Sequence, residues 1–366
     1  MMTALIRAQL SCLYSFIGQL KLFFMYGSED ERLLSTCFQQ LTGVLPSSLT
    51  QLRPHASERR RYRVQGGGSS YIGVVNGSAV ENDTFIYFAQ HFASRGLAVP
   101  AVYHYQPEAG AYLEQDLGDT TLLDLLTHER LSTGADFSQS AQEMYVAALQ
   151  QLSRFQIDSV RDSAFLQRIS HENLTVHMLR PDLELFMGEL VERALPGFDR
   201  GQIAANLNVL TDFLAAAQID FFMYRDFQAR NIMIVGSSPY FIDFQGGRRG
   251  PLQYDVVSLL YQTSARIPQS VRDNLLQSYL QAASQIYPLD VAVFSRFISA
   301  FTVYRMLQVL GVYGKQGLGA GKEYFSASIP GALATLTHEL ERKDFPLALP
   351  KLLACAQRLL NAFGVA

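Results

Sequence analysis

Apolar positions in the first third of the chain fall mainly in short runs of the kind that is typical of strands. Four stretches fit this pattern: 59–64, 71–75, 97–105 and 111–114. Residues 81–95 interrupt it, because their apolar positions recur at helical spacing until Gly96 ends the run. The sequence therefore predicts a small β-rich lobe with one inserted helix.

From residue 121 onward the apolar positions recur mostly at helical spacing. Three stretches predict amphipathic helices: 139–155, 183–194 and 203–217. Helices resume after residue 250 and continue towards the end of the chain. Strands first and helices later predict an α+β, two-lobed arrangement. We expect residues 25–115 to form the small N-terminal lobe and residues 116–366 the larger, helical C-terminal lobe.

A central segment, residues 223–245, interrupts the helical pattern and concentrates polar side chains. Two short runs of β-branched and aromatic residues lie in this segment, with Gly-Ser-Ser-Pro between them. Asp226 and Asn231 precede the first run, and Asp243 follows the second. This order predicts a loop, a strand, a tight turn and a second strand. Folding the hairpin back would return Asp243 to the neighbourhood of Asp226 and Asn231. Two carboxylates and an amide oxygen can grip Mg²⁺ there and orient a hydroxyl group.

The spacing of these residues resembles the catalytic motifs of protein kinases. Asp226 and Asn231 match the aspartate and asparagine of H-R-D-x-x-x-x-N, with Tyr224 in place of the histidine. Asp243-Phe244-Gln245 stands where kinases have D-F-G. The chain resembles the small-molecule branch of this fold, the aminoglycoside phosphotransferase-like family. The resemblance implies a two-lobed protein-kinase-like fold and phosphate transfer from ATP to the hydroxyl group of a small molecule.

The same resemblance implies a role for each polar residue of the central segment. Asp226 would orient the acceptor hydroxyl and accept its proton, while Asn231 and Asp243 would hold the Mg²⁺ that bridges the phosphates of ATP. Asp255, near the start of the helix that follows, is implied to hydrogen-bond the backbone of the catalytic loop. It would therefore support the loop without acting on the substrate.

The N-terminal lobe is implied to bind the nucleotide through three residues. Ser57, in the turn before the second strand, could donate to the phosphates of ATP, and the alternative is a simple loop. The backbone groups of Gln115 and Leu117 would face the adenine at a hinge between the lobes. An ordinary strand–turn boundary is the alternative for these two residues.

One feature departs from the family pattern. The third strand reads Tyr-Ile-Gly-Val-Val-Asn and lacks the lysine that neutralises phosphate charge. Glu81 stands where the glutamate partner of that lysine is expected, although a carboxylate at this place can also cap the helix. The missing cation could come from the arginines of the second strand, for which a solvated basic strand is the alternative. These arginines are Arg59, Arg60, Arg61 and Arg63.

Within the family, the fuller similarity is to the anomeric sugar kinases of cell-wall recycling, which act on N-acetylmuramate and N-acetylglucosamine. It rests on several stretches: 60–63, 112–118, 224–231, 242–245, 250–255, 305–311 and 321–324. This similarity implies an amino sugar as the substrate. Two alternatives stay open: a kinase for an amino alcohol, amino acid or aminoglycoside, and a non-catalytic nucleotide-binding regulator. The acidic residues of the C-terminal half are scattered, which argues against a polycationic substrate.

Composition limits which partners the protein is expected to bind and in which compartment it is expected to work. The net charge of −3 gives no basic excess for nucleic acid, and three widely spaced cysteines fit the reducing cytoplasm. Residues 1–24 are apolar and aromatic, but charged residues interrupt them, so we expect no membrane span. We interpret them as an upstream extension before a natural start at Met25. The sequence does not indicate an oligomeric state.

Overall fold

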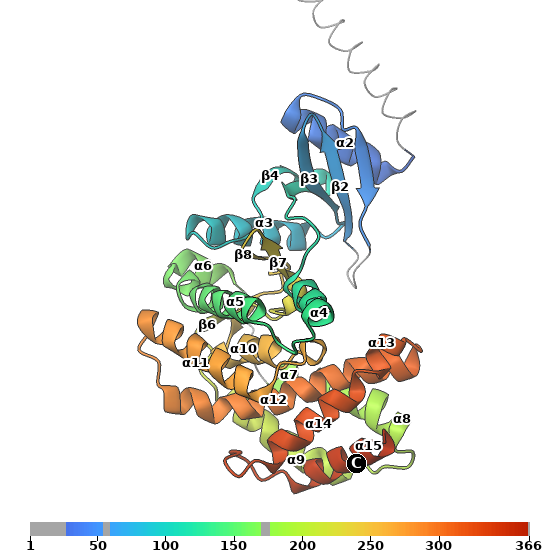
Figure 1. Cartoon of the computed structure of the whole chain (residues 1–366), viewed down its shortest axis with the longest axis vertical. Coiled ribbons are helices and arrows are strands. Elements are labelled where there is room, and N and C mark those ends of the chain that lie inside the picture. The colour runs from blue at the N-terminus through green and yellow to red at the C-terminus, as the bar shows by residue number, and fades with distance from the viewer. Residues whose placement is uncertain (1–26, 54–58, 170–175, 365–366) are drawn as a thin grey trace, which may run out of the picture. The chain divides into compact units, whose positions relative to one another are not determined.

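The computed structural model describes residues 27–53, 59–169 and 176–364. It divides into two compact units, Met1–Gly118 and Asp119–Ala366, which we call the N-terminal and the C-terminal unit. Most strands belong to the N-terminal unit and most helices to the C-terminal unit (Figure 1). The prediction of an α+β chain with a β-rich first part and a helical second part is confirmed.

The N-terminal unit is built on a five-stranded antiparallel sheet with the order β1-β2-β3-β5-β4. Its strands are β1 (Ser48–Gln51), β2 (Arg60–Gly66), β3 (Ser69–Val75), β4 (Val102–Gln106) and β5 (Ala111–Gln115). Among its described residues, the helices are α2 (Glu29–Thr42) and α3 (Ala79–Ser94), with a 3-10 turn, η1 (Pro107–Ala109). The strands predicted at 59–64, 71–75 and 111–114 are confirmed within two residues, whereas β1 was not predicted.

The strand predicted at 97–105 begins later than expected, at Val102. The chain before it turns instead of pairing, because the Val99 N–H donates to the Leu97 carbonyl at 3.0 Å. Pro100 adds to this effect, since it has no N–H to give to a neighbouring strand.

Alternation along the strands places the two helices on opposite faces of the sheet. Ala111 and Leu113 of β5 join a core cluster with Leu34 of α2, which covers one face (Figure 1). Tyr112, between them, points to the other face and stacks on Phe85 of α3, with ring centroids 5.2 Å apart. This packing fixes α3, and with it the polar residues at its N-terminus.

The C-terminal unit contains most of the helices and two small antiparallel sheets. Its first helices are α4 (Leu122–Thr133), α5 (Gln139–Ile157), η2 (Ser159–Arg161), α6 (Ser163–Arg168), α7 (Val176–Phe186), η3 (Met187–Val191), α8 (Glu192–Ala194) and α9 (Gly201–Ala215). The later ones are η4 (Ala229–Asn231), α10 (Leu252–Leu260), η5 (Thr263–Ala265), α11 (Gln269–Ile286), α12 (Val291–Tyr313), η6 (Gly314–Gly319), α13 (Glu323–Ser326), α14 (Ile329–Glu341) and α15 (Pro350–Ala362). The sheets pair β6 (Phe221–Met223) with β9 (Arg248–Gly250) and β7 (Ile232–Val235) with β8 (Ser238–Phe241).

A large apolar core joins α12 to α7, α9, α14 and α15. Leu307 and Leu310 of α12 are fully buried in it, with Leu214 of α9 and Leu333 of α14. At Gly311 a Cβ atom would lie 2.7 Å from the backbone nitrogen of Phe186, so only glycine permits this approach of α12 to α7. None of the helices in the described ranges is long and apolar enough to cross a membrane.

The helices predicted at 139–155 and 203–217 are confirmed within two residues as α5 and α9. The start of the helix predicted at 183–194 was wrong, because α7 already begins at Val176 and contains Pro181. A proline usually ends a helix, which hid the first turns of α7 in the sequence.

Candidate active site

The central segment is anchored by one buried carboxylate. Asp255, in α10, is fully buried and accepts hydrogen bonds from the N–H groups of Tyr224 at 2.7 Å and Arg225 at 2.8 Å. The side chain of Gln156 donates to the same carboxylate at 3.1 Å. Burial raises the pKa of Asp255 to about 7, while these hydrogen bonds act to lower it. The predicted support of the loop backbone by Asp255 is confirmed.

The loop from Asp226 to Asn231 is closed by a side chain. The Asn231 amide donates from Nδ2 to the backbone carbonyl of Asp226 at 2.9 Å, which leaves its Oδ1 as an acceptor. The Asp226 carboxylate is exposed and receives a hydrogen bond from Gln228 Nε2 at 3.3 Å. An exposed carboxylate above a fixed backbone is a suitable group to receive a proton from a substrate.

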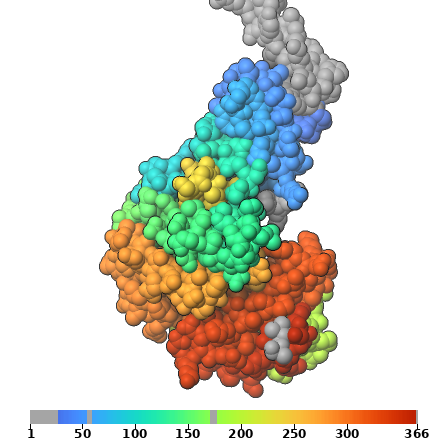
Figure 2. All heavy atoms as spheres, in the orientation of Figure 1, coloured from blue at the N-terminus to red at the C-terminus, as the bar shows by residue number. Residues whose placement is uncertain are grey.

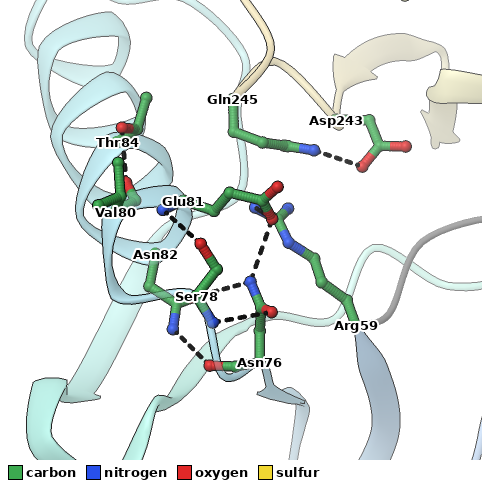
Figure 3. Close-up of polar contacts among 9 residues, drawn as sticks. All are labelled: Arg59, Asn76, Ser78, Val80, Glu81, Asn82, Thr84, Asp243 and Gln245. Atoms are coloured by element: carbon green, nitrogen blue, oxygen red, sulfur yellow. Dashed lines mark hydrogen bonds and ion pairs between the residues drawn. The ribbon is translucent and has the colours of Figure 1, made fainter.

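The hairpin returns the chain to this loop, as the sequence predicted. Ile232 of β7 pairs with Phe241 of β8, and the N–H of Ile242 donates to the Asn231 carbonyl at 3.1 Å. Asp243 therefore directly follows Ile242, whose backbone is hydrogen-bonded to that of Asn231. Its backbone is left-handed, with φ 69°, and its Oδ1 accepts from Gln245 Nε2 at 3.3 Å (Figure 3).

Tyr224 ties the two parts of the central segment together, a role that the motif comparison did not predict. It is buried among aromatic rings, including Phe155 and Phe244, and its hydroxyl donates to the Ile242 carbonyl at 2.6 Å. Burial raises the pKa of Tyr224 well above its usual value, and the nearby Asp243 acts in the same direction. The tyrosine thus stays protonated and links the start of the loop to the residue before Asp243.

The oxygen donors of the central segment fit a hard cation. Asn231 Oδ1 and the half-buried Asp243 carboxylate are the ligand types that Mg²⁺ prefers. Within the described ranges, no group of three or more His, Cys, Asp or Glu side chains could hold a metal ion. Mg²⁺ usually binds to one or two carboxylates and completes its shell with water and phosphate oxygens, so two protein ligands suffice.

The N-terminal unit contains one cation that is paired with Glu81. Arg59 Nη2 lies 3.4 Å from Glu81 Oε2, and the Arg59 side chain is only 1% exposed whereas that of Glu81 is 56% exposed. Asn76 holds the glutamate by donating from Nδ2 to Oε2 at 3.2 Å (Figure 3). In the described part of the chain, Arg59 Nε and Nη1 have no hydrogen-bond partner.

Two arginines of β2 pair with carboxylates of the described chain other than Glu81. Arg60 pairs with Asp30. Arg63 binds Asp116 through Nε at 2.8 Å and Nη2 at 3.0 Å, and Ser70 donates to the same carboxylate at 2.6 Å. Of the arginines named as replacements for the lysine, the structure thus pairs Arg59 with Glu81.

The remaining nucleotide-binding predictions stay predictions. Ser57 lies outside the described residues. The N–H of Gln115 donates to the Ala101 carbonyl at 2.8 Å, so a contact of Gln115 with adenine would have to come from its carbonyl. Leu117 is buried close to the end of the N-terminal unit.

A polar cluster next to the central segment was not predicted. Gln308 Nε2 donates to Asp182 at 2.7 Å, and Tyr304 also donates to this carboxylate. Tyr254 donates to Gln308 Oε1 at 3.1 Å, and the Arg305 guanidinium lies 5.8 Å from the Tyr254 ring centre. Tyr254 directly precedes Asp255, which connects this cluster to the loop. The sequence signals were the spacing of Tyr304, Arg305 and Gln308 along one helix face and the family similarity of residues 305–311.

Comparisons with known proteins agree with this geometry. Residues 49–289 match the model of the phosphotransferase enzyme family. N-acetylmuramate/N-acetylglucosamine kinase of Pseudomonas aeruginosa is 27% identical over 85% of this chain and 89% of its own length. The protein of the same name from Pseudomonas putida is 27% identical over 89% of this chain and 93% of its own length.

Solved structures share the fold. Choline kinase LicA from Streptococcus pneumoniae has a TM-score of 0.57 at 17% identity, covering 85% of this chain and 100% of its own. Amicoumacin kinase hAmiN, in complex with AMP-PNP, has a TM-score of 0.57 at 16% identity, covering 88% of this chain and 97% of its own. The chain has a protein-kinase-like fold and belongs to the phosphotransferase enzyme family, as an ATP-dependent kinase of small molecules.

Proposed function

We propose that this protein transfers the γ-phosphate of ATP to the anomeric hydroxyl of an amino sugar, with N-acetylmuramate and N-acetylglucosamine as the first substrates to test. The observation that carries this proposal is the similarity, over most of the chain, to two kinases named for these sugars. The intact Asp226, Asn231 and Asp243 support a catalytic role. They weigh against the alternative of a non-catalytic regulator.

In the proposed reaction, Asp226 accepts the proton of the sugar hydroxyl as the oxygen forms a bond to the γ-phosphorus. The bond between that phosphorus and the bridging oxygen of ADP breaks, and ADP leaves with the electron pair. The exposed carboxylate and the fixed loop backbone of Asp226 fit this role. Asn231 and Asp243 would hold Mg²⁺, which neutralises phosphate charge when bound.

Arg59 takes the place of the missing lysine in this proposal. Its guanidinium is paired with Glu81, as the kinase lysine is with its glutamate. Nε and Nη1 have no partner in the described part of the chain, so they can donate to phosphate oxygens. Gln115 and Leu117 remain proposed contacts of the adenine, and Ser57 a proposed contact of the phosphates. Because ATP is the donor, we also propose that the reaction takes place in the cytoplasm.

A substrate panel tests the proposal. Purified protein with Mg·ATP should release ADP with N-acetylmuramate or N-acetylglucosamine, and not with choline, ethanolamine or kanamycin. Turnover only with an amino alcohol or an aminoglycoside would replace the proposal by another small-molecule kinase. The fold of choline kinase is shared at 17% identity, which carries no argument about the substrate.

A further inference from the structure

The C-terminal unit contains a pocket rich in arginine that the proposed chemistry does not use. It has a volume of about 560 Å³ and is lined by α4, by the chain after α10, by the start of α11 and by α13–α14. On the face shown in Figure 2, the green surface of α4 lies beside the orange-red surface of the C-terminal helices. Arg130, Arg266 and Arg272 line the pocket, which we call the arginine pocket.

The positive charge of the arginine pocket is poorly neutralised. No Asp or Glu is among its lining residues in the described chain. Within the described residues, Arg130 donates to the backbone carbonyls of Asp136 and Ala265, the latter at 2.8 Å. Burial lowers the pKa of Arg130 and the positive charge of Arg266 lowers it further, while the carboxylate of Asp136, outside the lining, acts in the opposite direction. Two cations therefore lie close together, and no carboxylate of the lining pairs with either of them.

The positive charge of the third arginine, Arg272, is only partly neutralised. Arg272 stacks on the ring of Tyr261, with its guanidinium carbon 4.7 Å from the ring centre, and its buried Nε has no hydrogen-bond partner in the described part of the chain. Glu339 interacts electrostatically with Arg272 but also pairs with Arg342, at 3.6 Å. Ser264 and Tyr324 add hydroxyl groups to the wall, whereas the Ser328 hydroxyl already donates to the Tyr324 carbonyl at 2.9 Å. Guanidinium and hydroxyl donors together suit an anion.

Arg266 has a backbone conformation that side chains rarely adopt. Three non-glycine residues of the described chain have positive φ: Arg225, Asp243 and Arg266. The first two belong to the central segment, and Arg266 has φ 46°. Such conformations concentrate at functional sites, because the rest of the structure must hold them in place.

The arginine pocket is connected to the loop that carries Asp226. Gln262, which lines the pocket, accepts from the N–H of Ala229 at 2.8 Å through Oε1. Its Nε2 donates to the Ser264 hydroxyl at 2.9 Å. One side chain thus belongs both to the pocket wall and to the support of the loop.

We propose that the arginine pocket binds a carboxylate or phosphate anion, with Arg130 and Arg266 supplying the charge and the surrounding hydroxyls the hydrogen bonds. Resting on the proposed function, we assign this anion to the acid group of the acceptor. N-acetylmuramate carries a carboxylate and N-acetylglucosamine does not, so the pocket would favour the acidic sugar. A free anion, such as inorganic phosphate, is the other source of the same chemistry.

The test is Arg266→Asn, because asparagine tolerates a left-handed backbone and removes only the cation. Arg296→Asn, at an exposed arginine of α12 outside the pocket, is the matched control. We expect the KM for N-acetylmuramate to rise about 10- to 100-fold in Arg266→Asn, because the variant loses a hydrogen bond between the guanidinium and the sugar carboxylate. The kcat and the KM for N-acetylglucosamine should stay within about twofold of wild type.

A second measurement distinguishes the source of the anion. The thermal shift caused by inorganic phosphate is compared between wild type and Arg266→Asn. If phosphate loses its effect in the variant while both sugars react as before, the pocket binds a free anion. If neither the phosphate shift nor either KM changes, or if both sugars are impaired equally, the pocket is no anion site. A wild type that phosphorylates neither sugar would refute the proposed function, and the phosphate shift would still test the pocket.

Discussion

Replacement of Arg59 by alanine tests how the protein works without the usual lysine. The ion pair itself contributes little to stability, about 0–1 kcal/mol, because solvent reaches the Glu81 side chain, which is 56% exposed. The buried Arg59 side chain also packs over the Phe85 ring, and this packing is lost with it. The effect on ATP should be larger, since a hydrogen bond to a charged group contributes about 1.5–3 kcal/mol. We therefore expect kcat/KM for ATP to fall about 10- to 100-fold, while the melting temperature falls by only a few degrees.

The assay is the rate of ADP release at varied ATP concentration with saturating sugar. Arg60→Ala is the matched control, because Arg60 is half exposed and paired with Asp30; its kcat/KM for ATP should match wild type. Arg59→Lys should restore part of the activity, since lysine keeps the charge but not the planar group. Wild-type kinetics in Arg59→Ala, or an equal loss in Arg60→Ala, would refute the assignment of Arg59 to the phosphates.

Three further changes probe the central segment. Asp226→Asn should lower kcat about 10²- to 10⁴-fold with little effect on the thermal shift by Mg·ATP, and a variant that keeps a tenth of the turnover would contradict the proposed base. Asp243→Ala should abolish turnover and shrink the thermal shift by Mg·ATP, so equal shifts would count against metal binding by Asp243. Burial raises the pKa of Asp255 from 3.8 to about 7, so the folded protein holds this proton more tightly than the unfolded chain. Its contribution to the free energy of unfolding should therefore fall as the pH rises from about 4 to about 7 and be absent in Asp255→Asn; identical pH profiles of urea unfolding would show that Asp255 does not titrate there.

The sequence predicted the central segment well because its parts are close along the chain. Asp226, Asn231 and Asp243 lie within one loop and one hairpin, and the register of β7 with β8 follows from a short turn. The anchor at Asp255 was implied by the resemblance to the kinase family, which places an aspartate at the start of α10. Local order predicted the hairpin, and the resemblance to kinases added the expected role of each residue.

Contacts between distant parts of the chain could not be predicted in the same way. Arg59 pairs with Glu81 because the register of β2 and the packing of Phe85 on Tyr112 orient α3. Asp182 meets Gln308 over 126 residues, which no pattern of spacing reveals. The left-handed backbone of Arg266 gave no sequence signal either, since glycine usually occupies such positions.

The most direct test of the central claim is the chemistry of the product. Purified protein is incubated with Mg·ATP and N-acetylmuramate or N-acetylglucosamine, and the phosphorus NMR spectrum is recorded before and after mild acid. A phosphate on the anomeric oxygen is lost readily in acid, whereas a phosphate on another sugar hydroxyl survives. We predict a sugar 1-phosphate whose signal is replaced by inorganic phosphate after acid. An acid-stable phosphomonoester of the amino sugar would contradict the account.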